Sequence, residues 1–186
     1  MDNTVLQALR YDPQRGALLF NDVRYLLVRP ETLMAFQRAA AARLGAEADA
    51  LLYESGFTGG RLSAMRYREL FQLSDAETVE FMAHMGSEIG WGRMAVEHFD
   101  PAGRELVLGV EHSPFAAAYG AAESGVCHLI RGVFAGLADG LFGWAVEARE
   151  EACLAMGDER CRIRIRGLWA HGSSGGRTPP GEGRTR

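Results

Sequence analysis

Three cysteines and one glutamate are the residues of this 186-residue sequence best suited to chemistry. Glu150, Cys153 and Cys161 form an E-x-x-C-x7-C pattern around a Met-Gly-Asp-Glu turn, and Cys127 lies upstream. A hairpin of that length brings its two arms side by side, so Cys153 and Cys161 can face one centre. Three thiolates and a carboxylate make a soft four-ligand set, and zinc prefers closed tetrahedral sites of this kind. The pattern is therefore a candidate metal site that uses every cysteine of the chain.

Two other interpretations of the cysteines stay open on spacing alone. Buried cysteines often simply fill a core, and a Cys153–Cys161 disulfide is geometrically possible. Because the chain starts with polar residues and no apolar signal segment, we expect a cytoplasmic protein with reduced thiols. One feature opposes a metal. Glu150 and Cys153 point to opposite faces of a regular strand, so both bind one ion only if a bulge bends the chain between them.

Composition indicates one compact domain followed by a tail. Apolar residues make up 47% of the chain, which is enough for a sizeable core, and no apolar stretch approaches the ~20 residues of a membrane span. The net charge of −4 argues against direct nucleic-acid binding. Residues 171–186 are rich in glycine, serine, proline and arginine, so we predict a domain over 1–170 and a disordered tail over 171–186.

Periodicity and turn residues predict an α+β domain in which an antiparallel sheet packs against helices. The predicted strands cover 16–20, 23–28, 93–99, 105–111, 144–154 and 160–166. The predicted helices cover 30–44, 46–70, the segment after the Ser74 capping box, a short segment from Pro114, and 125–143.

Two further patterns belong to surfaces of these elements. Gly132, Gly136 and Gly140 recur every four residues and give their helix a smooth stripe for close backbone approach, while the glycines at 56, 59 and 60 permit a close helix contact or a kink. The four arginines between 160 and 166 alternate with apolar residues and form a solvated face that Glu147 and Glu151 can pair with.

The chain resembles a known family at these residues. The helix with Cys127, Glu150-x-x-Cys153, Ala155-x-Gly157-Asp158 and Cys161 is similar to the 4-vinyl reductase domain. The first half, from Gly16 through Asp22-Val23-Arg24-Tyr25-Leu26-Leu27 to Gly56-Phe57-x-x-Gly60, resembles the N-terminal sensor segment of phenol- and xylene-responsive transcription activators of bacteria.

The resemblance implies a fold, a metal, a ligand and a partner. The fold is the ligand-binding fold shared with TRAPP tethering subunits. The positions Cys127, Glu150, Cys153 and Cys161 hold a structural Zn²⁺, with a bulge expected between Glu150 and Cys153. The family binds small hydrophobic molecules in a pocket beside the zinc, and the sensors form homodimers through their N-terminal strands and helix.

We expect the pocket between the helix that contains His84, the strand 106–110 and the helix 127–141. The residues expected to contact a ligand are His84, Trp91, Val110, His112, Phe115, Tyr119 and Phe134. Phenol sensors grip the phenol hydroxyl with a histidine, for which His84 is suitably placed, and with a tryptophan on the central hairpin. Val110 is nearest to that tryptophan position, so some other apolar or aromatic ligand is the better expectation.

Three functions follow. The first is a zinc-containing protein that binds or senses a hydrophobic, aromatic or tetrapyrrole ligand. The second is an enzyme or accessory factor in vinyl reduction of (bacterio)chlorophyll, which we disfavour because the sequence shows no nicotinamide or flavin motif, and we predict no catalytic residue. The third is an assembly scaffold. The activators continue into an ATPase and a helix-turn-helix whereas this sequence stops, so we do not expect it to drive transcription itself.

Overall fold

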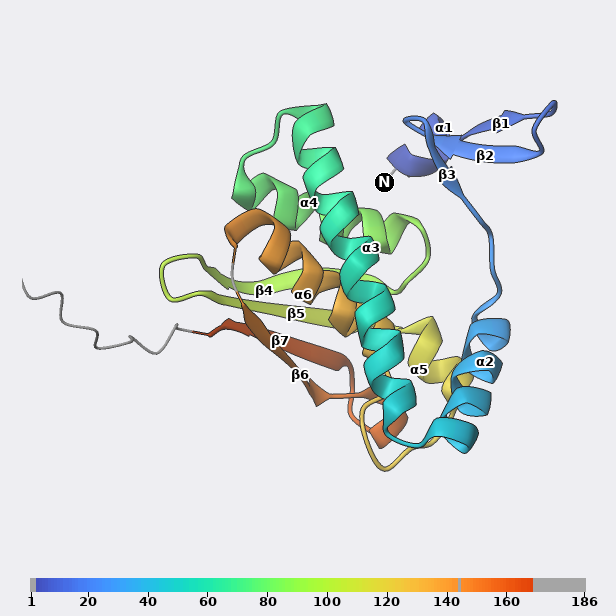
Figure 1. Ribbon diagram of the computed structural model, residues 1–186, viewed down its shortest axis with the longest axis vertical. Helices are drawn as coiled ribbons and strands as arrows, with labels where there is room; N and C mark the ends of the chain where they lie inside the picture. Colours follow the sequence, from blue (N-terminus) through green and yellow to red (C-terminus); the bar gives the residue numbers. More distant parts are fainter. Residues whose placement is uncertain (1–2, 144, 169–186) are drawn as a thin grey trace, which may run out of the picture.

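The computed structural model describes residues 3–143 and 145–168 (Figure 1). Its helices are α1 (Thr4–Ala8), α2 (Pro30–Leu44), α3 (Glu47–Phe71), α4 (Asp75–Glu88), α5 (Pro114–Tyr119), α6 (His128–Phe142) and the 3-10 turn η1 (Leu154–Met156). Its strands are β1 (Arg10–Asp12), β2 (Ala17–Phe20), β3 (Val23–Tyr25), β4 (Arg93–Asp100), β5 (Glu105–Glu111), β6 (Val146–Ala152) and β7 (Cys161–Gly167). Residue 144, the predicted start of the last hairpin, and the predicted tail over 171–186 lie outside the described residues.

The main sheet is antiparallel in the order β4-β5-β7-β6, which confirms the predicted α+β class. Along β7 the residues alternate, and Cys161, Ile163 and Ile165 are fully buried on the face that meets the helices. On β5, Leu106 and Leu108 are buried on that same face. Helix α6 lies on the sheet and α3 crosses over α6, so the core is enclosed between three layers (Figure 1).

Helices α3 and α6 touch backbone to backbone. A Cβ added at Gly60 of α3 would lie 2.0 Å from the carbonyl oxygen of Val133, and one added at Gly136 of α6 would lie 2.0 Å from that of Phe57. Real Cβ atoms do not approach other atoms closer than 3.0 Å, so only glycine fits at these two positions. The predicted glycine patterns of the two helices therefore face each other at one crossing.

The N-terminal part forms a separate three-stranded sheet, β1-β2-β3, that includes elements absent from the sequence prediction. Strand β1 and helix α1 are new, and β3 ends at Tyr25 rather than at residue 28. Tyr25 pairs with Leu18, and β2 begins one residue earlier after the turn at Gly16, so the chain beyond Tyr25 has no partner backbone. As a result, Leu26 and Leu27 are 77% and 83% exposed.

Glu88, at the end of α4, attaches this N-terminal sheet and α1 to the rest of the fold. Its carboxylate accepts hydrogen bonds from the backbone N–H of Thr4 at 2.7 Å, from the Thr4 hydroxyl at 2.8 Å and from the N–H of Val5 at 3.2 Å. Asn3 donates from its side chain to the Glu88 carbonyl at 2.8 Å. One residue thus satisfies the open N–H groups at the start of α1.

The arginine face of β7 is paired more widely than its sequence indicated. Arg162 and Arg164 pair with Glu151 of β6 as expected, but also with Glu97 of β4 and Glu105 of β5. The expected partner Glu147 instead pairs with an arginine of its own strand. Across the described residues, no helix combines the length and the apolar character that crossing a bilayer requires.

Candidate metal centre and cavity

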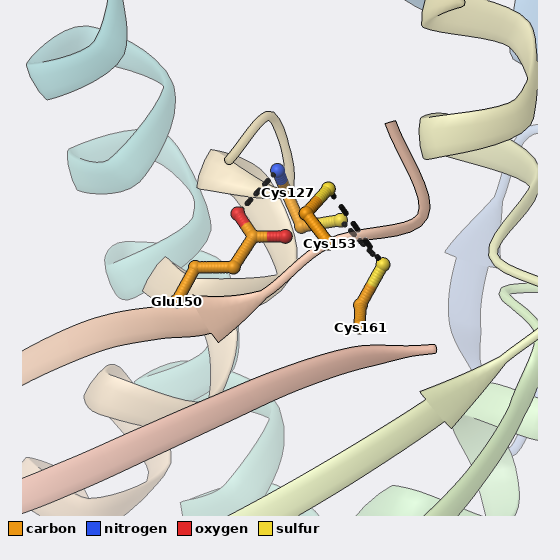
Figure 2. Close-up of side chains that lie close together, drawn as sticks. All are labelled: Cys127, Glu150, Cys153 and Cys161. Carbon is orange, nitrogen blue, oxygen red and sulfur yellow. Dashed lines mark hydrogen bonds between the residues drawn. The ribbon is translucent and has the colours of Figure 1, made fainter. Parts of the chain in front are cut away.

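The four predicted ligands meet at one point beside the main sheet (Figure 2). One side-chain ligand atom from each of Cys127, Glu150, Cys153 and Cys161 lies within 4.8 Å of the others. All three cysteines are buried, with exposed fractions of 2% or less. The residues come from the N-cap of α6, from β6, from the loop before η1 and from the start of β7, so the site joins three segments that are distant in sequence.

A bulge in β6 lets Glu150 and Cys153 share this site. The pairing of β6 with β7 shifts register between Glu150 and Ala152, so Glu151 has no residue opposite it. The extra residue turns the strand locally and removes the conflict that a regular strand would impose. The loop is then held by Asp158, whose carboxylate accepts the Cys153 N–H at 2.8 Å.

The thiols are free and spaced as metal ligands, not as a disulfide. The sulfur of Cys161 lies 3.5 Å from that of Cys127 and 3.8 Å from that of Cys153. A disulfide needs about 2.05 Å between sulfurs. A tetrahedral zinc with Zn–S bonds of about 2.3 Å has sulfur–sulfur edges of about 3.8 Å. The observed spacing fits such an ion.

The fourth ligand position is a buried carboxylate with one oxygen in use. Oε2 of Glu150 accepts the backbone N–H of Cys127 at 2.9 Å, whereas Oε1 is buried without a partner among the described residues. Burial raises the pKa of Glu150 to about 8. Gly125 makes room for the carboxylate, since a Cβ there would lie 2.4 Å from Oε2. An unpaired buried carboxylate oxygen beside three thiols is the donor set that a cation would satisfy.

The thiols share their protons unequally. Hydrogen bonds from Cys127 and Cys153 lower the pKa of the Cys161 thiol to about 4, and the same hydrogen bonds together with burial raise the pKa of Cys127. The backbone N–H of Leu154 also donates to the Cys161 sulfur at 3.4 Å. The site therefore stabilises negative charge on sulfur, and a divalent cation would displace the remaining protons.

The surroundings include residues that sequence reasoning missed. Gln37 of α2 is buried and donates to the carbonyl of Val126 at 3.0 Å, which fixes the loop just before Cys127. The predicted helix start at 125 is wrong, because residues 125–127 are extended beside Glu150 and α6 begins at His128. The Asp158 turn was visible in the sequence as a Gly-Asp pair, but nothing local pointed to Gln37.

A cavity of about 240 Å³ lies between α3, α4 and α6. It is lined by Tyr25, Ser55, Gly56, Gly59, Gly60, Ser63, Tyr67, Met82, Met85, Gly86, Ile89, Trp91, Met94, Leu129, Val133 and Phe134. Two of its three predicted walls, α4 and α6, are present. Strand β5 does not line it, because α3 and Met94 of β4 take that place.

The predicted ligand-contact residues divide into two groups. Trp91 and Phe134 line the cavity. Phe115 packs edge-on against Trp91 with ring centroids 5.5 Å apart, on the side away from the cavity. Val110 is fully buried in the core. These four residues surround one region.

The other three lie away from it. The His84 side chain is 60% exposed on the outer face of α4, where its Nε2 lies 3.4 Å from Glu88. His112 is exposed in the turn after β5, and Tyr119 lies half-buried beneath the guanidinium of Arg38. A histidine within an apolar helix pattern can face outward when it falls one position beside the buried stripe, and His84 does so.

Comparisons with known proteins agree with this architecture. The family model of the 4-vinyl reductase (4VR) domain matches residues 106–167, which contain all four candidate ligands. None of the curated proteins matches the chain.

Three solved structures share the fold at low identity. The phenol-responsive sensory domain of the transcription activator PoxR, solved with phenol, has a TM-score of 0.77 at 22% identity and covers 88% of this chain and 87% of its own. A trafficking protein particle complex subunit 3 from Naegleria fowleri, covalently bound to palmitic acid, has a TM-score of 0.55 at 17% identity over 75% of this chain and 95% of its own.

The third is a vinyl-4-reductase family protein from Methanocaldococcus jannaschii, with a TM-score of 0.50 at 14% identity over 77% of this chain and 83% of its own. The resemblance to the 4-vinyl reductase domain family is thereby confirmed: the segment from β5 to β7 matches that domain, and the chain has the fold of the PoxR sensory domain and of the tethering subunit.

Proposed function

We propose that this protein is a zinc-stabilised module that binds a small, neutral, largely apolar molecule in the cavity between α3, α4 and α6. The observation that carries the proposal is the cavity itself: about 240 Å³ in volume, with no charged side chain in its lining. A mostly apolar space with a few polar groups is the usual form of a small-molecule site.

The volume favours a ligand of one or two rings. A cavity of about 150 Å³ lined by apolar side chains binds benzene, so 240 Å³ leaves room for a substituted benzene. A tetrapyrrole macrocycle is several times larger than benzene and does not fit without a large opening of the helices. The cavity therefore supports the aromatic-ligand hypothesis over the vinyl-reduction hypothesis, and over a scaffold that has no internal site.

In this proposal Cys127, Glu150, Cys153 and Cys161 would hold Zn²⁺ as a structural ion. Four protein ligands close a tetrahedral site and leave no position for a substrate. The chain's own residues then do the work of positioning. Cys127 is the N-cap of α6, and α6 supplies Leu129, Val133 and Phe134 to the cavity wall. Fixing the start of α6 against β6 and β7 would hold that wall in place.

The comparisons support this proposal through the nature of the related sites. The PoxR sensory domain was solved with phenol and the tethering subunit with palmitic acid, so two proteins of this fold hold largely apolar molecules. A homodimer is part of the proposal, because the linker after β3 exposes Leu26, Leu27 and Val28, which are 77%, 83% and 58% exposed. Apolar side chains that follow one another on the surface are typical of an interface.

Native mass spectrometry combined with thermal unfolding tests the proposal. We expect one zinc per chain, and loss of that zinc in Cys161→Ser with a large drop in melting temperature, because binding energy of a structural zinc is folding energy. Glu159→Gln, in the exposed turn of the same hairpin, is the matched control. Ethylbenzene at a hundredfold excess over its dissociation constant should stabilise the wild type by about 2.7 kcal/mol.

Two results would contradict the proposal. Full zinc retention in both Cys161→Ser and Cys153→Ser would remove the metal assignment. A melting temperature unchanged by ethylbenzene, phenol and other substituted benzenes would remove the ligand-binding function.

A further inference from the structure

The polar groups of the cavity are concentrated at one pair of tyrosines. Tyr25 of β3 and Tyr67 of α3 both line the cavity, and their hydroxyl groups are hydrogen-bonded to each other. Ser55, another polar residue of the lining, already donates its hydroxyl to the carbonyl of Leu51 at 2.7 Å. The tyrosine pair is therefore the main uncommitted polar feature of an otherwise apolar wall.

The pair has hydrogen-bonding capacity to spare. Each tyrosine hydroxyl carries one donor hydrogen and can also accept. A single hydrogen bond between two hydroxyls uses one hydrogen, so the second hydrogen and lone pairs on both oxygens stay open to a further partner. Burial raises the pKa of Tyr25 and of Tyr67, so both hydroxyls remain neutral donors at physiological pH.

The two partners are held differently. Tyr67 is 1% exposed and packs among the rings of Phe20, Phe71 and Phe81, with centroid distances of 5.9, 6.0 and 5.4 Å. Tyr25 is only half-buried and comes from the N-terminal sheet. Tyr67 is thus a fixed point, and Tyr25 can adjust its hydroxyl to a bound molecule.

We propose that the Tyr25–Tyr67 hydroxyl pair is the polar anchor of the cavity and selects neutral molecules that carry one carbonyl or hydroxyl oxygen on an apolar, ring-sized body. This inference rests on the proposed ligand-binding function and specifies its ligand class. The body of the ligand would lie against Met82, Met85 and Met94, whose flexible thioethers adapt to ring edges.

The same lining disfavours anions. None of the cavity residues is a lysine, arginine or histidine, and a carboxylate that leaves water needs a charged partner. An aromatic acid therefore binds poorly even when its size is right, whereas a ketone of the same shape keeps a hydrogen bond from the free tyrosine hydrogen.

Isothermal titration of the full chain with three probes of matched shape tests the anchor. The probes are acetophenone, ethylbenzene and benzoate. In the wild type, acetophenone should bind about 2- to 12-fold more tightly than ethylbenzene, which is the worth of one net hydrogen bond. Benzoate should bind far more weakly than either.

Matched variants separate the anchor from the rest of the cavity. Tyr67→Phe and Tyr25→Phe should each reduce the preference for acetophenone while ethylbenzene affinity is kept, since the ring volume hardly changes. Tyr11→Phe, an exposed tyrosine on β1, should leave both affinities as in the wild type. Tyr25→Phe gives an independent measurement where Tyr67→Phe does not fold.

The outcomes distinguish this inference from the function on which it rests. If ethylbenzene and acetophenone bind the wild type equally, or if both variants keep the preference, the anchor is refuted and the binding function stands. Benzoate that binds as tightly as acetophenone would likewise refute selection for neutral molecules. If none of the probes binds, the proposed function fails with it.

Discussion

Gly60 of α3 occupies a place where a methyl group has no room, and Gly60→Ala is therefore a sharp test of the helix crossing. The added Cβ would lie 2.0 Å from the Val133 carbonyl oxygen and 2.6 Å from the Val133 Cα, although real Cβ atoms need at least 3.0 Å. Because the obstacle is backbone, α3 and α6 must separate by about 1 Å. A gap of that size forfeits about a quarter to a half of the dispersion energy of the atoms it parts.

Gly59→Ala is the matched control on the same helix. A Cβ at Gly59 meets nothing within 4 Å, and both glycines line the same cavity. Alanine adds about 1 kcal/mol of helix propensity at either position, so this gain cancels between the two variants. Overpacking of a close contact costs typically 1–3 kcal/mol, and we place Gly60→Ala near about 3 kcal/mol below Gly59→Ala.

Thermal unfolding followed by circular dichroism measures this difference. For a domain of this size, 1 kcal/mol shifts the melting temperature by about 2–4 °C, so the two variants should differ by about 6–12 °C. Gly59→Ala should melt slightly above the wild type. Equal melting temperatures for the two variants would show that the helices are not in backbone contact, and the account of the crossing would be wrong.

Two further predictions concern the N-terminal part. Burial alone would raise the pKa of Glu88, but hydrogen bonds from Thr4 and Val5 outweigh it and lower that pKa below its usual value, so the stabilisation is complete above about pH 4.3 and is lost as the pH falls through the folded-state pKa. Glu88→Gln should therefore cost about 1–3 kcal/mol at pH 7 in urea unfolding, and a difference that persists undiminished at pH 2 would contradict this. Leu27→Asp should convert the proposed homodimer to monomer in sedimentation at micromolar concentration, whereas Leu62→Asp, 65% exposed on α3, should not; a wild type that sediments only as monomer would refute the dimer.

Sequence signals located most of the regular elements. Helix α2 begins at Pro30 and ends at Leu44 before Gly45, as its proline, its apolar stripe and its glycine predict. Ser74 caps α4 through a complete capping box with Glu77. The metal ligands were predictable because few residue types bind zinc, and the bulge in β6 was required once Glu150 and Cys153 were assigned to one site.

Other features depend on contacts that no local pattern encodes. Strand β1 has three residues and α1 has five, too few to show a period. The helical position of His84 was predicted, but the face on which it lies depends on how α4 packs, and a shift of one residue exchanges cavity for solvent. The cavity walls also escaped prediction, since α3 reaches the cavity only because Gly60 meets the backbone of Val133 far along the chain.

The crossing of α3 and α6 also bears on how such a protein can diversify. Its closest contacts are made by backbone atoms, so the spacing of these two helices is independent of the side chains around the cavity. Met82, Met85 and Met94 come from α4 and β4, on the other side of the space. Exchanging one of these for a larger or smaller apolar residue changes the volume and leaves the helix frame intact. New chemical preferences are therefore accessible through single substitutions, without a loss of stability that would first have to be compensated elsewhere.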